Sequence, residues 1–233
     1  MVKVLSVNGK IPLVDGKAIK ALDGGTDAED GIVARTITTY TNNRVQSIGE
    51  RVFNGCYALT SVDFPAVATI SNSAFNGCKK LTNANFPEAT TIGESAFNNC
   101  YALTSVDFPA VATISNSAFN GCRELTSVNF PAATTIGNFA FNGCYALTSV
   151  DFPAVATIRD GAFINCKKLT SVVLRKTDTI CTLSATFAFD NTPIKSGTGY
   201  IYVPDTLVDQ YKAATNWSTY AANIKPLSEY TEV

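Results

Sequence analysis

The chain repeats itself every 22 residues from Ile37 to about Lys176. The line LTSVDFPAVATISNSAFNGC stands intact at 59–78 and again at 103–122, and variants of it fill the rest of this region. A fixed period in the low twenties is typical of a solenoid, in which one short supersecondary unit per coil stacks on its neighbours. The rows that keep this step include Phe53, Phe75, Phe97, Phe119, Phe141 and Phe163, and Cys56, Cys78, Cys100, Cys122, Cys144 and Cys166.

Each repeat begins with a segment that has the pattern of a half-buried strand. In the pattern LxxVxF, Val62 and Phe64 fall on one side and Asp63 on the other, which is the period of a strand with one buried face. Strands of successive coils stack about 4.8 Å apart, so we expect them to form one parallel sheet. Pro65 and its equivalents end the strand, because proline cannot donate to a sheet ladder. The β-branched run VATI or ATTI that follows predicts a second, narrow sheet.

The stretch SNSAFNGC closes each repeat and predicts a helical or 3-10 turn. Only glycine or asparagine stands just before the cysteine, which indicates a positive φ angle at the end of the turn. This closing row consists of Gly55, Gly77, Asn99, Gly121, Gly143 and Asn165.

The ends of the chain differ from the repeat. Residues 1–22 contain Asn-Gly and Asp-Gly hairpin signals and predict a short β segment, and residues 23–36 form an acidic, glycine-rich linker. The solenoid occupies 37–176, and residues 177–233 form an irregular last coil and a C-terminal cap.

The cap sequence predicts one strand and a helix. GYIYVP at 199–204 is expected to be the final strand of the chain. Asp205 is the expected N-cap of an amphipathic helix, and Trp217, Tyr220 and Ile224 extend its apolar stripe.

Composition excludes several kinds of function. The net charge of −1 offers no basic surface for nucleic acid, and no apolar run is long enough for membrane insertion. The N-terminus shows no export signal. Histidine is absent, which removes the commonest general base and metal ligand. We expect no metal and no cofactor, since cysteines 22 residues apart in a line cannot form a tetrahedral site. The cysteines are expected to form a buried row of free thiols, with Cys181 outside it.

The combination LxxVxFPxxVxxIxxxAFxxC resembles the leucine-rich repeats of the BspA-like (Treponema pallidum type) family, in frame over 37–174. The resemblance implies an α/β repeat solenoid of right-handed 22-residue coils, with a parallel sheet on one face and short turns on the other. It also implies binding rather than catalysis, because such proteins are mostly bacterial surface or secreted proteins that adhere to host proteins or other cells. The stretch at 201–221 resembles a segment that follows such repeats in gut-bacterial and bacteriophage proteins.

A longer period of 44 residues lies within the repeat and indicates where a ligand could bind. The position after each cysteine alternates tyrosine with a cation, and the outward strand position alternates Asp with Asn. Such alternation separates like charges and permits cation–π contacts, so stacking and tandem duplication explain it without any ligand. The functional hypothesis is a ligand-binding strip with flanking tyrosines, and Phe139 is a further candidate as an exposed aromatic anchor. The candidate residues are Ser61, Asp63, Asn85, Ser105, Asp107, Asn129, Asp151, Tyr57, Tyr101, Tyr145 and Phe139.

We expect no catalysis from this strip. Asp63 and Asp107 could approach the carboxyl spacing of an inverting glycosidase, about 6.5–9.5 Å. However, the aspartates recur identically, and nothing in the sequence separates an acid from a base among them. The sequence therefore favours a non-enzymatic adhesin, on the cell surface or secreted, that binds host extracellular protein, glycan or another bacterial surface. A bacteriophage virion or tail-associated receptor-binding protein is the alternative, and a structural spacer is the third.

Overall fold

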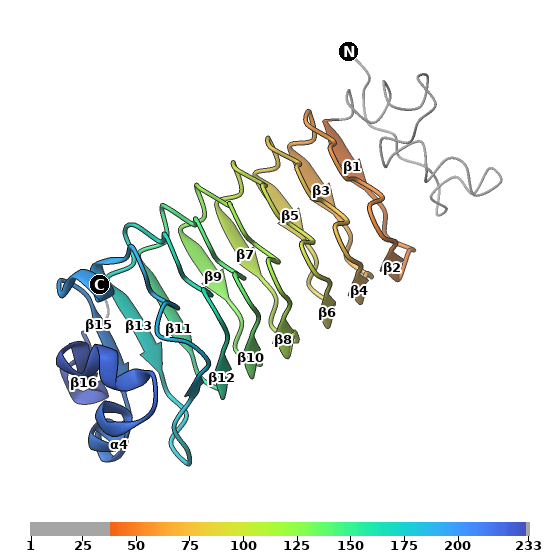
Figure 1. The fold of residues 1–233 in the computed structure, drawn as a ribbon. Coiled ribbons are helices and arrows are strands. Elements are labelled where there is room, and N and C mark those ends of the chain that lie inside the picture. The colour runs from red at the N-terminus through yellow and green to blue at the C-terminus, as the bar shows by residue number, and fades with distance from the viewer. Residues whose placement is uncertain (1–37, 232–233) are drawn as a thin grey trace.

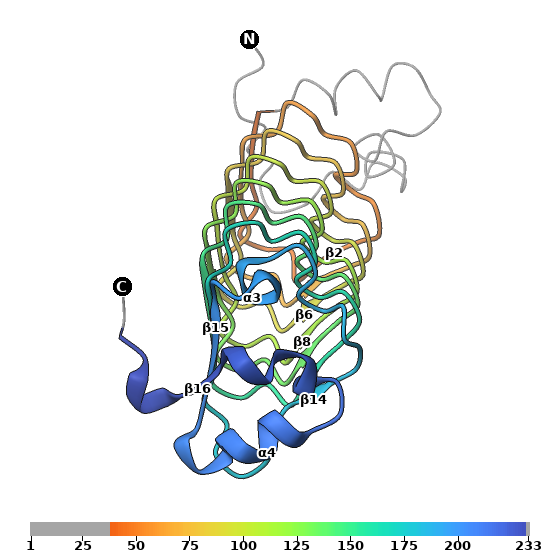
Figure 2. The same ribbon diagram turned by 60° about the vertical axis from the view of Figure 1, so that its left-hand side comes forward.

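The computed structural model describes residues 38–231 and shows a stack of coils closed at its C-terminal end by short helices (Figure 1). The expected β segment at 1–22 and the linker at 23–36 lie outside the described residues. Each coil contributes one strand to a wide face and one shorter strand to a narrow face (Figure 2). The wide-face strands of the repeat are β1 (Thr39–Thr41), β3 (Ser61–Asp63), β5 (Asn83–Asn85), β7 (Ser105–Asp107), β9 (Ser127–Asn129), β11 (Ser149–Phe152) and β13 (Ser171–Leu174).

The predicted narrow sheet is present and unbroken. Over residues 38–231 it has seven parallel strands, whose isoleucines and single leucine face the core. Each strand is only two residues long, because the turn follows at once. The strands are β2 (Ser47–Ile48), β4 (Thr69–Ile70), β6 (Thr91–Ile92), β8 (Thr113–Ile114), β10 (Thr135–Ile136), β12 (Thr157–Ile158) and β14 (Thr182–Leu183).

The wide face is not one continuous sheet, so that expectation was wrong. Within the described residues the strands fall into three groups, β1-β3-β5, β7-β9 and β11-β13-β15-β16. Both breaks come where a coil carrying Asn is followed by one carrying Asp. At the first break the rings of Phe86 and Phe108 lie 6.2 Å apart, against 5.4 Å for Phe64 and Phe86 within a group. The coils therefore separate on this face at every second step.

The turns hold the coils together at every step instead. The N–H of Phe75 donates to Ala96 O of the next coil at 2.8 Å, and the N–H of Gly77 donates to Asn98 O at 2.7 Å. Between these bonds the N–H of Cys78 donates back to Phe75 O at 3.1 Å, which is the spacing of a single 3-10 turn. The buried phenylalanines of the turns stack in parallel, with ring centroids 5.0 to 5.5 Å apart from coil to coil.

Two rows of the turn adopt positive φ angles. The predicted Gly or Asn row is confirmed, with φ between 59° and 75°. The second row was not predicted, because it contains serine, arginine and phenylalanine, which rarely adopt this conformation. Its members are Arg51, Ser73, Ser95, Ser117, Phe139 and Gly161, with φ between 54° and 59°.

The cysteine row forms the predicted column of free thiols. All seven cysteines lie in the described part of the chain, where they are buried and free. The Cys78 thiol donates to Phe53 O at 3.0 Å, and the next four cysteines repeat this contact. Burial raises the pKa of the Cys166 and Cys181 thiols to about 12. These thiols are therefore poor nucleophiles in the folded protein.

The last coil and the cap complete the core. Phe189 stacks on Phe163 with ring centroids 5.5 Å apart, as a further turn of the solenoid. Trp217 is buried and donates from its indole nitrogen to Cys181 O at 2.6 Å, and Tyr211 accepts from the N–H of Cys181 at 2.7 Å. The cap elements are α3 (Pro193–Ser196), β15 (Tyr200–Val203), η1 (Asp205–Leu207), α4 (Val208–Ala213), η2 (Trp217–Asn223), β16 (Ile224–Pro226) and η3 (Leu227–Glu229).

Two details of the cap differ from the sequence prediction. Asp205 is not an N-cap: it lies inside η1, and its carboxylate accepts from the N–H of Ser228 at 3.1 Å. β15 is not the final strand, because β16 pairs with it in parallel and brings Ile224 into the sheet rather than onto a helix. Both errors arise because the chain folds back onto the sheet after η2, which no local pattern indicates.

Candidate binding face

The outward aspartates of the wide face each have a defined neighbour. Asn85 donates from its amide to Asp63 at 2.7 Å, and Asn129 donates to Asp107 at 2.8 Å. The fifth member of the row, Asp151, instead forms an ion pair with Arg175, with a shortest distance of 2.7 Å. The predicted alternation of Asp and Asn thus produces bonded pairs of coils. The amide nitrogen of each Asn is used within its own pair.

The tyrosines and cations form one continuous ladder at the turn that leads into these strands. The Lys79 ammonium lies 5.1 Å from the ring centroid of Tyr57 and 5.7 Å from that of Tyr101. The guanidinium of Arg123 lies 4.4 Å from Tyr101 and 5.8 Å from Tyr145. The ladder continues to Lys167, 5.0 Å from Tyr145. Tyr57 and Tyr145 remain 47% and 39% exposed, so their outer surfaces stay open to a partner.

Phe139 is exposed as predicted but belongs to another part of the molecule. It is 40% exposed and lies in the turn after β10, so it is separate from the wide strands. Its φ is 55°, and its ring covers Gly161 of the next coil, where a Cβ would lie 2.5 Å from Cε1 of the ring. The structure thus groups the other candidates on the wide face and leaves Phe139 apart.

The sequence interpretation missed an aromatic cluster at the C-terminal end of the wide face. Tyr202 of β15 lies in register with the outward row, and its ring is 5.0 Å from that of Tyr230. Tyr200 lies 6.2 Å from Tyr202 and 4.5 Å from the Lys225 ammonium. The alternation in the strand YIYV, with buried Ile201 between outward tyrosines, was the available signal.

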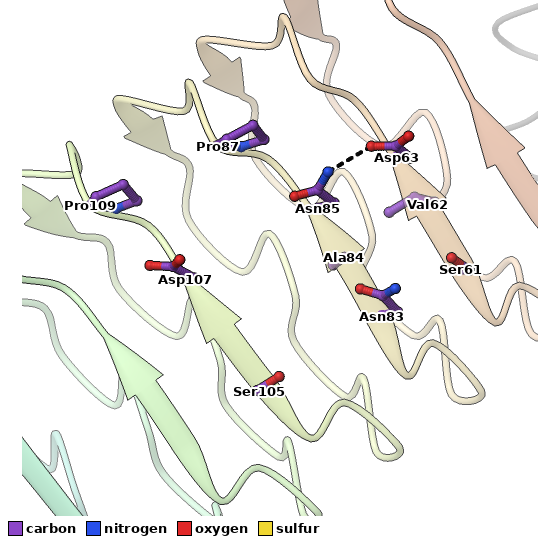
Figure 3. A pocket seen from close by; sticks show the side chains of 10 residues that line it. All are labelled: Ser61, Val62, Asp63, Asn83, Ala84, Asn85, Pro87, Ser105, Asp107 and Pro109. Carbon is purple, nitrogen blue, oxygen red and sulfur yellow. Dashed lines mark hydrogen bonds between the residues drawn. The ribbon is translucent and has the colours of Figure 1, made fainter.

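A pocket of about 630 Å³ opens on the wide face at the first break in the sheet (Figure 3). It spans β3, β5 and β7, and the two prolines that follow β5 and β7 line it as well. Six of its ten lining residues are polar, which distinguishes it from the mostly apolar pockets that hold drug-like molecules. The lining residues are Ser61, Val62, Asp63, Asn83, Ala84, Asn85, Pro87, Ser105, Asp107 and Pro109.

Two searches of the described residues bear on other kinds of site. Over 38–231 no group of three or more Asp, Glu, Cys or His side chains is placed to hold a metal ion. In the same part of the chain, no helix has the length and apolar character needed to cross a bilayer.

The stacked coils, the two parallel sheets and the buried turns define a leucine-rich repeat solenoid. The chain belongs to the BspA type leucine rich repeat family, whose six-copy repeat region matches residues 35–133 and 90–208, more than half of the sequence. Comparison with the curated proteins finds no match.

Solved structures share this fold. A leucine rich repeat protein from T. pallidum is 24% identical, with a TM-score of 0.61 over 76% of this chain and 83% of the other. A leucine-rich repeat protein from Eubacterium ventriosum is 29% identical, with a TM-score of 0.57 over 68% of this chain. This chain spans 44% of the E. ventriosum structure. A leucine rich cell surface protein from Faecalibacterium prausnitzii is 21% identical, with a TM-score of 0.45 over 72% and 60% of the two chains.

Proposed function

We propose that the chain is a non-catalytic binding module of a bacterial cell-surface or secreted adhesin. Its wide face would contact a host extracellular protein or glycan, or the surface of another bacterium. The leucine-rich repeat fold is widely used for protein binding, because stacked coils present an extended surface. This general role agrees with membership of the family.

One observation supports the proposal most strongly: the exposed side chains of this face are already held in place. Asn85 fixes Asp63, and Lys79 and Arg123 hold the ring of Tyr101 from both sides. A side chain that is ordered before binding loses little conformational entropy when a partner arrives. Tyrosine and arginine are also the residue types that contribute most at protein interfaces.

The same face gives little support for catalysis. Asp63 and Asp107 have equivalent positions and the same kind of Asn partner, so the geometry makes neither of them the acid nor the base of a hydrolytic pair. Binding is therefore the better use of these carboxylates.

Charge reversal on one coil tests the proposal. Asp107→Lys changes the wide face, and Thr113→Lys places the same charge on the exposed narrow strand of that coil. Surface plasmon resonance against extracellular matrix proteins, mucin glycans and bacterial cells should show at least about a tenfold loss of affinity for the first variant. The Thr113 control should bind like the wild type. Equal binding by both variants, or no binding of the wild type to any surface, would contradict an adhesin that uses this face.

The bacteriophage alternative uses the same face, and the neighbouring genes would distinguish it. Tail or capsid genes beside this one support a virion protein, whereas an export signal upstream supports the adhesin. A spacer is the remaining reading if no partner binds.

A further inference from the structure

We infer that the pocket at the first break of the wide face binds a neutral glycan segment. The inference rests on the proposed function and assigns one ligand class to one place on that face. Three observations lead to it: the opening between two coil pairs, the chemistry of the side chains that line the pocket, and two residues that depart from the repeat.

The opening arises from the orientation of one amide. Asn85 turns its nitrogen toward Asp63, so its oxygen lies on the side of Asp107 (Figure 3). Carboxylate and amide oxygens are both acceptors, so no side-chain hydrogen bond can form across this step. The described strands β5 and β7 share no ladder bond either. The facing strand edges therefore present backbone groups that water or a ligand can satisfy.

The lining side chains match hydroxyl groups rather than ions. Asp63 and Asp107 each accept one bond from an Asn, which leaves a second carboxylate oxygen for a ligand. Asn83, Ser61 and Ser105 can both donate and accept, as a sugar hydroxyl does. Lysine and arginine are absent from the residues that line the pocket. Two carboxylates without a cation disfavour sulfated or uronic sugars, whose negative charge would be repelled.

Two departures from the repeat fall inside this pocket. The wide strands otherwise carry serine and valine at the positions of Asn83 and Ala84, as Ser127 and Val128 do at the second break. Ala84 lacks the two methyl groups of valine, which deepens the floor beside Val62. Asn83 adds an amide to the wall. The exchange makes the first break both roomier and richer in hydrogen-bonding groups.

The test restores the repeat consensus in this coil. Asn83→Ser with Ala84→Val introduces residues that the equivalent strands already hold, so the variant should fold, which circular dichroism checks. Ser127→Asn is the matched control on the equivalent strand of the second break. The probes are cellobiose, maltose, lactose and mannobiose, with a sulfated chondroitin disaccharide as the anionic counterpart. Binding is measured by saturation-transfer NMR and calorimetric titration.

We expect at least one neutral disaccharide to bind the wild type and the Ser127 control, and to bind the double variant at least about tenfold more weakly. The sulfated disaccharide should not bind. The inference is overturned if no neutral disaccharide binds, if the double variant binds equally well, or if only the sulfated probe binds. Binding to matrix proteins or cells that survives such a result would leave the adhesin proposal intact. Loss of all binding to those surfaces would remove both.

Discussion

Exchanging Gly161 for serine tests the contact between two neighbouring turns. The change places a side chain at a φ of 59° and directly beneath the ring of Phe139. Serine occupies the same position in three other coils, so the backbone strain of about 1–2 kcal/mol is tolerated in this fold. The new Cβ would lie 2.5 and 2.6 Å from two ring carbons, whereas normal carbon contacts are about 3.5–4.0 Å.

The ring of Phe139 must therefore move when Gly161 is replaced. A strained rotamer costs about 0.5–1.5 kcal/mol. Because the ring is 40% exposed, moving it further outward gives up part of its burial, and full burial of a large apolar side chain is worth about 1.5–3 kcal/mol. We expect Gly161→Ser to cost about 2–4 kcal/mol in the wild type, and about 1–2 kcal/mol when Phe139 is also serine. The coupling between the two positions is then about 1–2 kcal/mol.

Urea unfolding followed by circular dichroism measures this coupling across the four proteins of a double-mutant cycle. The slopes of the transitions must agree, since a solenoid can lose cooperativity between coils. An equal cost of Gly161→Ser in both backgrounds would refute the contact argument, and only the strain of the backbone would remain.

Three further perturbations test the repeat. Gly77→Val should cost about 2 kcal/mol or more because φ is 74°, whereas Gly77→Asn should be nearly tolerated, and a thermal melt that ranks them equally refutes the positive-φ explanation. Asn85→Asp should lower stability by about 1 kcal/mol at low salt, and a second change, Asp63→Asn, should restore it; urea midpoints at two salt concentrations check both. The Cys166 thiol, with its folded pKa raised to about 12, is neutral in both states below pH 9, so stability should fall as pH rises from 9 toward 12 by up to about 1.4 kcal/mol per pH unit for each such thiol. A melting temperature that does not change between pH 8 and 10.5, or thiols that alkylate in the native protein, would contradict that burial.

The period made most of the core predictable. A side chain that returns every 22 residues meets the same surroundings in each coil, so the burial of Phe75 and Cys78 followed from the spacing alone. The positive φ of Gly77 followed because only glycine and asparagine share its row. The positive φ of Phe139 could not be predicted, since its row contains residue types that rarely adopt it.

The breaks in the wide sheet and the cap depended on information that the period does not contain. The breaks follow the direction in which Asn85 turns its amide, and either direction fits the sequence equally well. The addition of β16 to the sheet depends on contacts between distant segments, so Ile224 looked helical by local pattern. The candidate binding face was half predictable: Asp107 and Tyr101 were found by their alternation, whereas Tyr202 was visible only as a strand position.

The pairing of coils restricts how this gene can change in length. Unequal recombination that inserted or removed 22 residues would place two aspartates, or two tyrosines, in adjacent coils and would break the amide bonds and cation–π contacts of Asp63 and Tyr101. A gain or loss of 44 residues preserves every one of these contacts. Natural variants of the array should therefore differ by even numbers of coils, and each added pair would carry another gap on the wide face.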